Sequence, residues 1–82
     1  MTRLLKTAQE MLEMAYEAED GHFEQTLFDG RIVCVTDYNE TLLLKDFRKT
    51  TTIWSEAHIS FEELRQVINE SNDALIDAGL AA

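Results

Sequence analysis

Residues 23–38 have the sequence FEQTLFDGRIVCVTDY, and this stretch decides the fold class. Two runs rich in Val, Ile, Thr, Phe and Tyr, residue types that favour strands, flank the dipeptide Asp29-Gly30. Asp-Gly between two such runs is the strongest short signal for a β-hairpin, because both residues of the tight turn must reach positive φ. The stretch therefore predicts two antiparallel strands that are joined at Asp29-Gly30.

The strand signal continues after residue 38. Asn39-Glu40 predicts a second, weaker turn before residues 41–47 (TLLLKDF), and residues 50–54 (TTTIW) are compatible with a fourth strand. If both turns have two residues, alternation of side chains defines the two faces of the sheet. One face would carry Phe28, Val33, Val35, Leu42 and Leu44, and the other would carry Leu27, Ile32, Cys34, Tyr38, Leu43 and Phe47.

Amphipathic helices are predicted on both sides of the strand region. From Thr2 to Asp20, apolar residues recur at the i, i+3, i+4, i+7 spacing of one helix face, and Gly21 is the expected stop. Residues 60–63 (SFEE) form a capping-box sequence, so a second helix is expected to begin after Ser60 and to end near Gly79. Its predicted buried stripe is Phe61, Leu64, Val67, Ile68 and Leu75.

The predicted fold is a single α+β domain over residues 1–82: a helix, a three-stranded or four-stranded antiparallel sheet, and a helix. The two helices are expected to cover one face of the sheet. Because the other face is also partly apolar, a homodimer that covers it is a further hypothesis.

Composition excludes several classes of partner. The chain has 82 residues, sixteen acids and seven bases, which give a formal net charge of −9. Direct binding to nucleic acid or to an anionic membrane is not expected, because both need clustered Lys and Arg. The N-terminus lacks the pattern of a signal peptide, and the single Cys34 cannot form an internal disulfide, so a cytoplasmic location is expected.

Carboxylates are concentrated on the predicted helices. In residues 1–20, five acids and two bases give −3, and in residues 60–82, five acids and one base give −4. The candidate partner-binding residues are Glu10, Glu13, Glu17 and Asp20 on the first helix and Glu70, Asp73 and Asp77 on the second. Acids at a helix C-terminus, and Arg3 and Lys6 at the predicted N-terminus, oppose the helix dipole. Two interpretations follow: a solvated face that keeps the protein soluble, or an interaction site for a strongly basic partner.

No catalytic or metal-binding motif is predicted. His22 and His58 are 36 residues apart, and a zinc site made from them and Cys34 would have to borrow carboxylates. Cys34 has no predicted base beside it, and the three glycines are isolated rather than grouped in a phosphate-binding loop. We therefore expect a protein that is not an enzyme and has no cofactor.

In its length, its acidity, its lack of cofactor motifs and its carboxylate row from Glu10 to Asp20, the chain resembles the small acidic proteins with which bacteriophages inhibit host defence complexes. Anti-CRISPR proteins and DNA mimics belong to this class. The resemblance implies a viral inhibitor in the host cytoplasm that docks its acidic helix surface on a basic, nucleic-acid-binding protein. The alternative is a small homodimeric structural or assembly protein, or an interaction protein of the antitoxin or immunity type.

Overall fold

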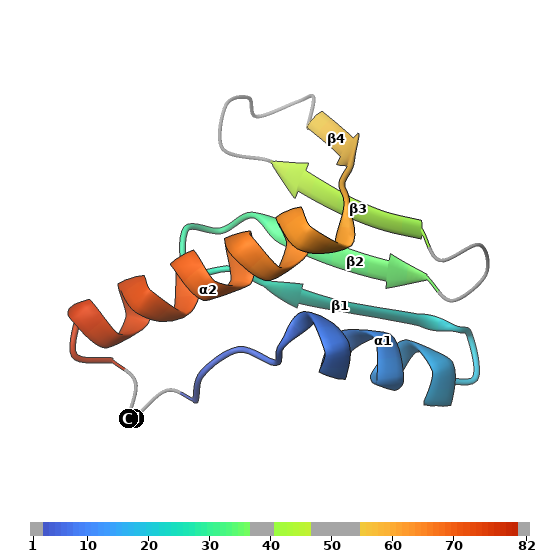
Figure 1. The fold of residues 1–82 in the computed structure, drawn as a ribbon, viewed down its shortest axis with the longest axis horizontal. Coiled ribbons are helices and arrows are strands. Elements are labelled where there is room, and N and C mark those ends of the chain that lie inside the picture. The colour runs from blue at the N-terminus through green and yellow to red at the C-terminus, as the bar shows by residue number, and fades with distance from the viewer. Residues whose placement is uncertain (1–2, 37–40, 47–54, 81–82) are drawn as a thin grey trace.

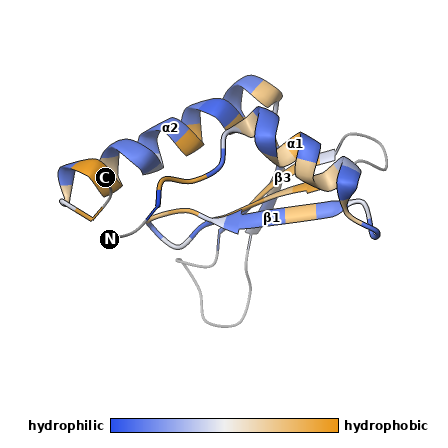
Figure 2. Cartoon of the chain, turned by 90° about the horizontal axis from the view of Figure 1, so that it is seen from below, coloured by the Kyte–Doolittle hydropathy of each residue, from blue (hydrophilic) through white to orange (hydrophobic). Residues whose placement is uncertain are grey.

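The computed structural model describes residues 3–36, 41–46 and 55–80, which form two helices and one antiparallel sheet. The elements, in chain order, are α1 (Ala8–Glu17), β1 (His22–Thr26), β2 (Ile32–Thr36), β3 (Thr41–Asp46), β4 (Ser55–His58) and α2 (Phe61–Asp77). The strands lie side by side in this order (Figure 1). Both helices lie on the same side of the sheet (Figure 2). The predicted α+β fold is confirmed, with β4 as the fourth strand; residues 50–54 lie outside the described residues.

The core lies between the helices and the inner face of β2 and β3. Val33 and Val35 are fully buried there, and their strand partners Leu44 and Leu42 pack against the same cluster. Its buried members are Ala8, Met11, Ala15, Leu27, Val33, Val35, Leu64 and Ile68. Complete burial of a large apolar side chain contributes about 1.5–3 kcal/mol. These few residues therefore provide most of the stabilisation available to so short a chain.

The β1–β2 turn differs from the prediction. The Leu27 N–H donates to the carbonyl of Arg31 over 2.7 Å, and the Gly30 N–H donates to the carbonyl of Leu27 over 3.0 Å. The loop thus has three residues, 28–30, with Gly30 at a φ of 96°. The register of β1 is shifted by one residue from the predicted one, so Leu27 is buried on the inner face and Phe28 lies exposed in the turn. The predicted places of Leu27 and Phe28 were wrong because a shift of one residue exchanges the two faces.

The β2–β3 connection preserves the predicted faces. Thr36 pairs with Thr41, whereas a two-residue turn at residues 39–40 would have paired residue 38 with Thr41. The turn itself lies outside the described residues. Because the register differs from the predicted one by two residues, Val33, Val35, Leu42 and Leu44 share a face, as predicted.

The outer face of the described sheet is more polar than predicted. Ile32, Cys34 and Leu43 lie on it, but β1 contributes His22, Glu24 and Thr26, and β4 contributes Glu56 and His58. Tyr38 and Phe47, which were predicted on this face, lie outside the described residues. The homodimer stays a prediction.

The first helix is shorter than predicted. Thr7 is its N-cap: the Glu10 N–H donates to Thr7 Oγ1, and the Thr7 N–H donates to Glu10 Oε1, both over 3.1 Å. This capping box in residues 7–10 (TAQE) starts α1 at Ala8. Residues 3–6 precede the helix and are held by side chains, since the Leu5 N–H donates to Asn72 Oδ1 and the Gln25 amide bonds both to the N–H and to the carbonyl of Lys6.

The helix also ends before its predicted stop. Ala18 is the C-cap, with an extended backbone, and Gly21, with a φ of 64°, lies in the turn that leads into β1. The predicted charge conflict at the N-terminus is absent, because Arg3 and Lys6 lie before α1 and Glu10 lies in its first turn, where a carboxylate is favourable. The conflict at the C-terminus stays, since Glu17 is the last residue of α1 and the last turn has no base.

The second helix begins and ends where the sequence predicts. Ser60 accepts from the Glu63 N–H, and Glu63 accepts from the Ser60 N–H, as a capping box requires. At the other end, the Gly79 N–H donates to the carbonyl of Ile76 and the Leu80 N–H donates to that of Leu75, which is a Schellman motif. Leu64, Ile68 and Leu75 of the predicted stripe are buried. Phe61 and Val67 are partly buried against the core.

Ser71, which lies outside the predicted buried stripe, links α2 to the β1–β2 hairpin by a hydrogen bond. Ser71 is buried, and its Oγ accepts the Phe28 N–H over 2.7 Å. This backbone donor cannot bond within the ladder, because it lies in the three-residue turn. The bond therefore positions the turn against the middle of α2.

We expect Ser60→Ala to lower the free energy of unfolding by about 0.5–2 kcal/mol, because the Glu63 N–H at the start of α2 loses its acceptor. Urea melts of the wild type and the variant measure this difference. An unchanged midpoint would show that Ser60 does not act as the cap in solution.

We expect Ser71→Ala to lower the free energy of unfolding by about 1–3 kcal/mol, because it leaves the Phe28 N–H without its acceptor. The control is Ser55→Ala at an exposed position on β4, where the hydroxyl is 3.4 Å from the carbonyl oxygen of Asp46. Thermal or urea melts measure both variants. Equal losses in the two would contradict a specific link between the turn and α2.

Candidate functional site

The predicted carboxylate row on α1 is exposed along its whole length. Glu10, Glu13 and Glu17 lie on α1, and Asp20 lies in the turn after it. Within the helix the row spans about 10 Å, at about 1.5 Å of rise per residue. Glu10 and Asp20 also have structural roles, since Glu10 closes the capping box and Asp20 Oδ1 accepts the His22 N–H. The bond from the Thr7 N–H lowers the pKa of Glu10.

The acids of α2 form a separate patch. Glu70, Asp73 and Asp77 are exposed on the C-terminal half of α2. Figure 1 shows that α1 and α2 run towards opposite ends of the molecule, so Glu17 and Asp77, the last residues of their helices, lie far apart. The structure does not bring the seven predicted residues together on one surface.

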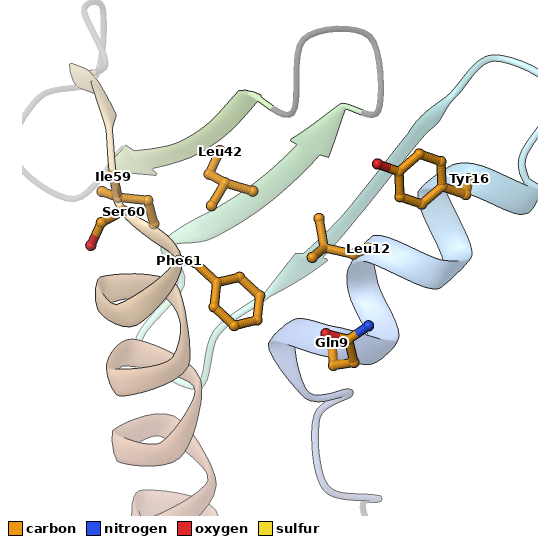
Figure 3. Close-up of a pocket in the computed structure, with 7 residues that line it drawn as sticks. All are labelled: Gln9, Leu12, Tyr16, Leu42, Ile59, Ser60 and Phe61. Carbon is orange, nitrogen blue, oxygen red and sulfur yellow. The ribbon is translucent and has the colours of Figure 1, made fainter.

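A groove lies beside the row on α1. We call it the interhelix groove, and it has a volume of about 500 Å³. Figure 3 shows its lining: Gln9, Leu12 and Tyr16 from α1, Leu42 from β3, Ile59 and Ser60 from the segment before α2, and Phe61 at the first position of α2. Leu12, Leu42 and Phe61 point towards one another across it. The groove exists because α1 and α2 diverge and leave part of the inner face of β3 between them.

Glu13 connects the groove to the carboxylate row. It lies four residues after Gln9 and three before Tyr16, so it is a neighbour of both groove residues on the surface of α1. Glu17 follows one turn later on the same side. The lip of the groove on α1 is thus negatively charged, while its floor is apolar.

A second candidate site lies on the opposite face of the sheet. His22 and Glu24 are two residues apart on β1, and Cys34 of β2 is the strand partner of Glu24. His22 Nε2 and Cys34 Sγ lie 3.3 Å and 3.2 Å from Glu24 Oε2. We call these three residues the outer-face cluster. Their possible ligand atoms all lie within 4.8 Å of one another, the spacing of groups that share one metal ion.

The cluster changes the acidity of two of its members. Its hydrogen bonds from Cys34 and His22 lower the pKa of the Glu24 carboxyl. Burial, together with the hydrogen bond to Glu24, raises the pKa of the Cys34 thiol from 9.0 to about 11. At neutral pH the protonated thiol therefore donates to an ionised carboxylate.

Both sites include residues whose role the sequence does not predict. Leu12 and Tyr16 fit the apolar spacing of the first helix, yet Tyr16 is 58% exposed. The divergence of two helices leaves no signal in the sequence of either one. The outer-face cluster was hidden by the register error, which placed His22 and Glu24 on the face opposite Cys34. His22, Glu24 and Cys34 share one face of the sheet only in the register that a three-residue turn sets.

No protein-family model matches the chain, and comparisons with curated proteins and with solved structures gave no match. In the part of the chain that the structure describes, neither helix has the length and apolar character to cross a membrane.

The raised pKa of Cys34 predicts a loss of stability at alkaline pH. A raised folded-state pKa gives stability that is complete below the unfolded-state pKa, near 9.0, and is lost as the pH rises towards about 11. The free energy of unfolding of the wild type should therefore fall more steeply above pH 9 than that of Cys34→Ser, whose hydroxyl does not titrate there. Urea melts of both proteins across this range, with a reductant, measure the difference. Parallel curves would contradict a buried, protonated thiol.

Proposed function

We propose that the protein is a non-enzymatic, protein-binding inhibitor that docks the acidic lip of its interhelix groove on a basic, nucleic-acid-binding partner. The observation that carries this proposal is the exposed row of carboxylates on α1 directly beside an apolar groove. The resemblance to small acidic phage inhibitors implies the same class of function.

The charges of the row support a role in binding. Among the described residues, Glu13 and Glu17 have no hydrogen-bond or ion-pair partner, unlike Glu10 and Asp20. They are spaced four residues apart, so they repel each other, and Glu17 also opposes the helix dipole. A helix that serves only as a cover for the core gains nothing from this arrangement, whereas a basic partner gains from every carboxylate in the row.

The groove restricts the kinds of side chain that a partner must present. A contact that uses both features needs basic side chains for the lip and an apolar side chain for the floor formed by Leu12, Leu42 and Phe61. A basic amphipathic segment of a nucleic-acid-binding protein has this composition. A partner that binds there would be anchored by apolar burial and guided by charge, which acts mainly on the association rate.

The pKa directions of Glu10, Glu24 and Cys34 favour binding over catalysis at these three positions. General acids need a raised carboxyl pKa, but Glu10 and Glu24 both have lowered values. A nucleophilic cysteine needs a lowered thiol pKa, but that of Cys34 is raised to about 11.

We expect the double variant Glu13→Gln/Glu17→Gln to bind a basic partner more slowly, by about tenfold at low salt, because charge complementarity controls encounter. The matched control is Asp73→Asn/Asp77→Asn, which also removes two carboxylates four residues apart, one of them the last residue of its helix. The probe is a fluorescent helical peptide of Lys and Leu, measured by stopped flow from about 50 to 300 mM salt. The control should associate as the wild type does, and the α1 variant should lose most of the salt dependence.

Capture from a cell lysate extends the test to natural partners. The natural partner should cross-link to the wild type and to the α2 control, but not to the α1 variant. When this partner is purified and bound to labelled duplex DNA, addition of the wild type should release the DNA. Equal slowing of the peptide by both double variants would mean that only net charge matters. That result, or captured proteins that keep their DNA, would overturn the proposal.

A further inference from the structure

The outer-face cluster has the composition and geometry of a metal site. It offers one imidazole, one carboxylate and one sulfur from two adjacent strands, and strand pairing rather than loop conformation holds them in place. His22 and Glu24 alternate with an inward-facing residue, so both point outwards, and Cys34 stands directly across from Glu24. A site on paired strands is held more rigidly than one on loops.

A neighbouring residue orients the imidazole. Thr36 is the strand partner of His22, and its Oγ1 lies 3.4 Å from His22 Nδ1. Nε2 is then directed at Glu24, 3.3 Å away. Metal-binding histidines are typically held in this way, with one ring nitrogen hydrogen-bonded to a nearby group and the other available to the ion.

We propose that His22, Glu24 and Cys34 bind one divalent transition-metal ion of the Zn²⁺ type, with water completing its coordination. Nitrogen and sulfur ligands select such ions over Mg²⁺ or Ca²⁺, which prefer oxygen alone. Access is from the solvent side, because the side chains of His22 and Glu24 are 38% and 49% exposed while Cys34 is buried. The site lies on the face of the sheet opposite the interhelix groove, so this proposal is independent of the proposed function.

Binding of the ion requires the loss of one proton. The Cys34 thiol bonds to the metal as a thiolate, so its proton leaves to solvent and the hydrogen bond from Sγ to Glu24 is replaced by metal bonds to both residues. Of the charged groups that act on the thiol, Lys45 on β3 favours the thiolate, whereas Glu24 on β1 and Glu56 on β4 oppose it. Because binding releases this proton, the affinity for the ion should rise with pH.

Titration with Co²⁺, which occupies zinc sites and reports on its ligands, tests the proposal. The wild type should bind one ion per chain and develop the near-ultraviolet absorption of a cobalt–thiolate bond. Cys34→Ser should lose this absorption, and His22→Gln and Glu24→Gln should each weaken binding by at least about tenfold. His58→Gln is the control, because His58 lies on the same face but pairs with Leu43 and does not belong to the cluster.

Two further measurements separate a metal site from a set of hydrogen bonds. Circular dichroism of each variant establishes that it is folded, and Thr36→Val should weaken Co²⁺ binding by about tenfold without touching a ligand. Three results would each overturn the proposal: no thiolate band in the wild type, the same Co²⁺ affinity in His22→Gln, Glu24→Gln and wild type, or an affinity that does not change with pH. Release of one proton per ion in weakly buffered solution would support it.

Discussion

The three-residue turn at residues 28–30 is the constraint on which the rest of the structure depends. The hydrogen bond from the Leu27 N–H to the Arg31 carbonyl sets the register of β1 against β2. That register places Phe23 and Leu27 on the inner face with the core, and His22 and Glu24 on the outer face with Cys34. A register shifted by one residue would expose Leu27 and separate the cluster. Gly30 allows the positive φ that the loop needs, and Arg31 is held by Asp29 through its Nε at 2.8 Å.

The sequence predicts those parts of the fold that depend on interactions between residues close together in the chain. Ser60, Glu63 and Gly79 act within one turn of α2, and both ends of that helix follow from them. The start of α1 is equally local, since Thr7 and Glu10 form the same capping box, but the apolar residues Leu4 and Leu5 extend the helical pattern past it. Leu5 instead makes a long-range contact, because its N–H donates to Asn72 Oδ1, and no local sequence pattern predicts this bond.

The registers of the strands on the two sides of β2 show the same contrast between local and long-range interactions. The β2–β3 register differs from the predicted one by two residues, so the described residues of β2 and β3 lie on the predicted faces. The β1–β2 register differs by one residue, so the two faces of β1 are exchanged. Asp29-Gly30 fits both a two-residue and a three-residue loop. The bond from the Phe28 N–H to Ser71, 43 residues away, supports the longer one. The same contrast applies to the candidate sites. Helical spacing alone predicts the carboxylate row. The interhelix groove and the outer-face cluster depend on how separate elements pack and pair, which local sequence does not predict.

The two faces of the sheet carry different chemistry, and the sheet between them keeps them independent. The helical face combines an apolar groove with carboxylates that destabilise their own helix end, which is consistent with a surface whose use lies outside the isolated chain. On the outer face, Glu24 is stabilised by two donors, and one of them, the Cys34 thiol, keeps its proton because it is buried. A cation that displaces this proton would replace the hydrogen bond from the thiol to the ionised Glu24 carboxylate with direct attraction to two negative groups, in a protein of net charge −9. The net negative charge of the chain would therefore add a favourable electrostatic contribution to binding of a cation at the proposed site.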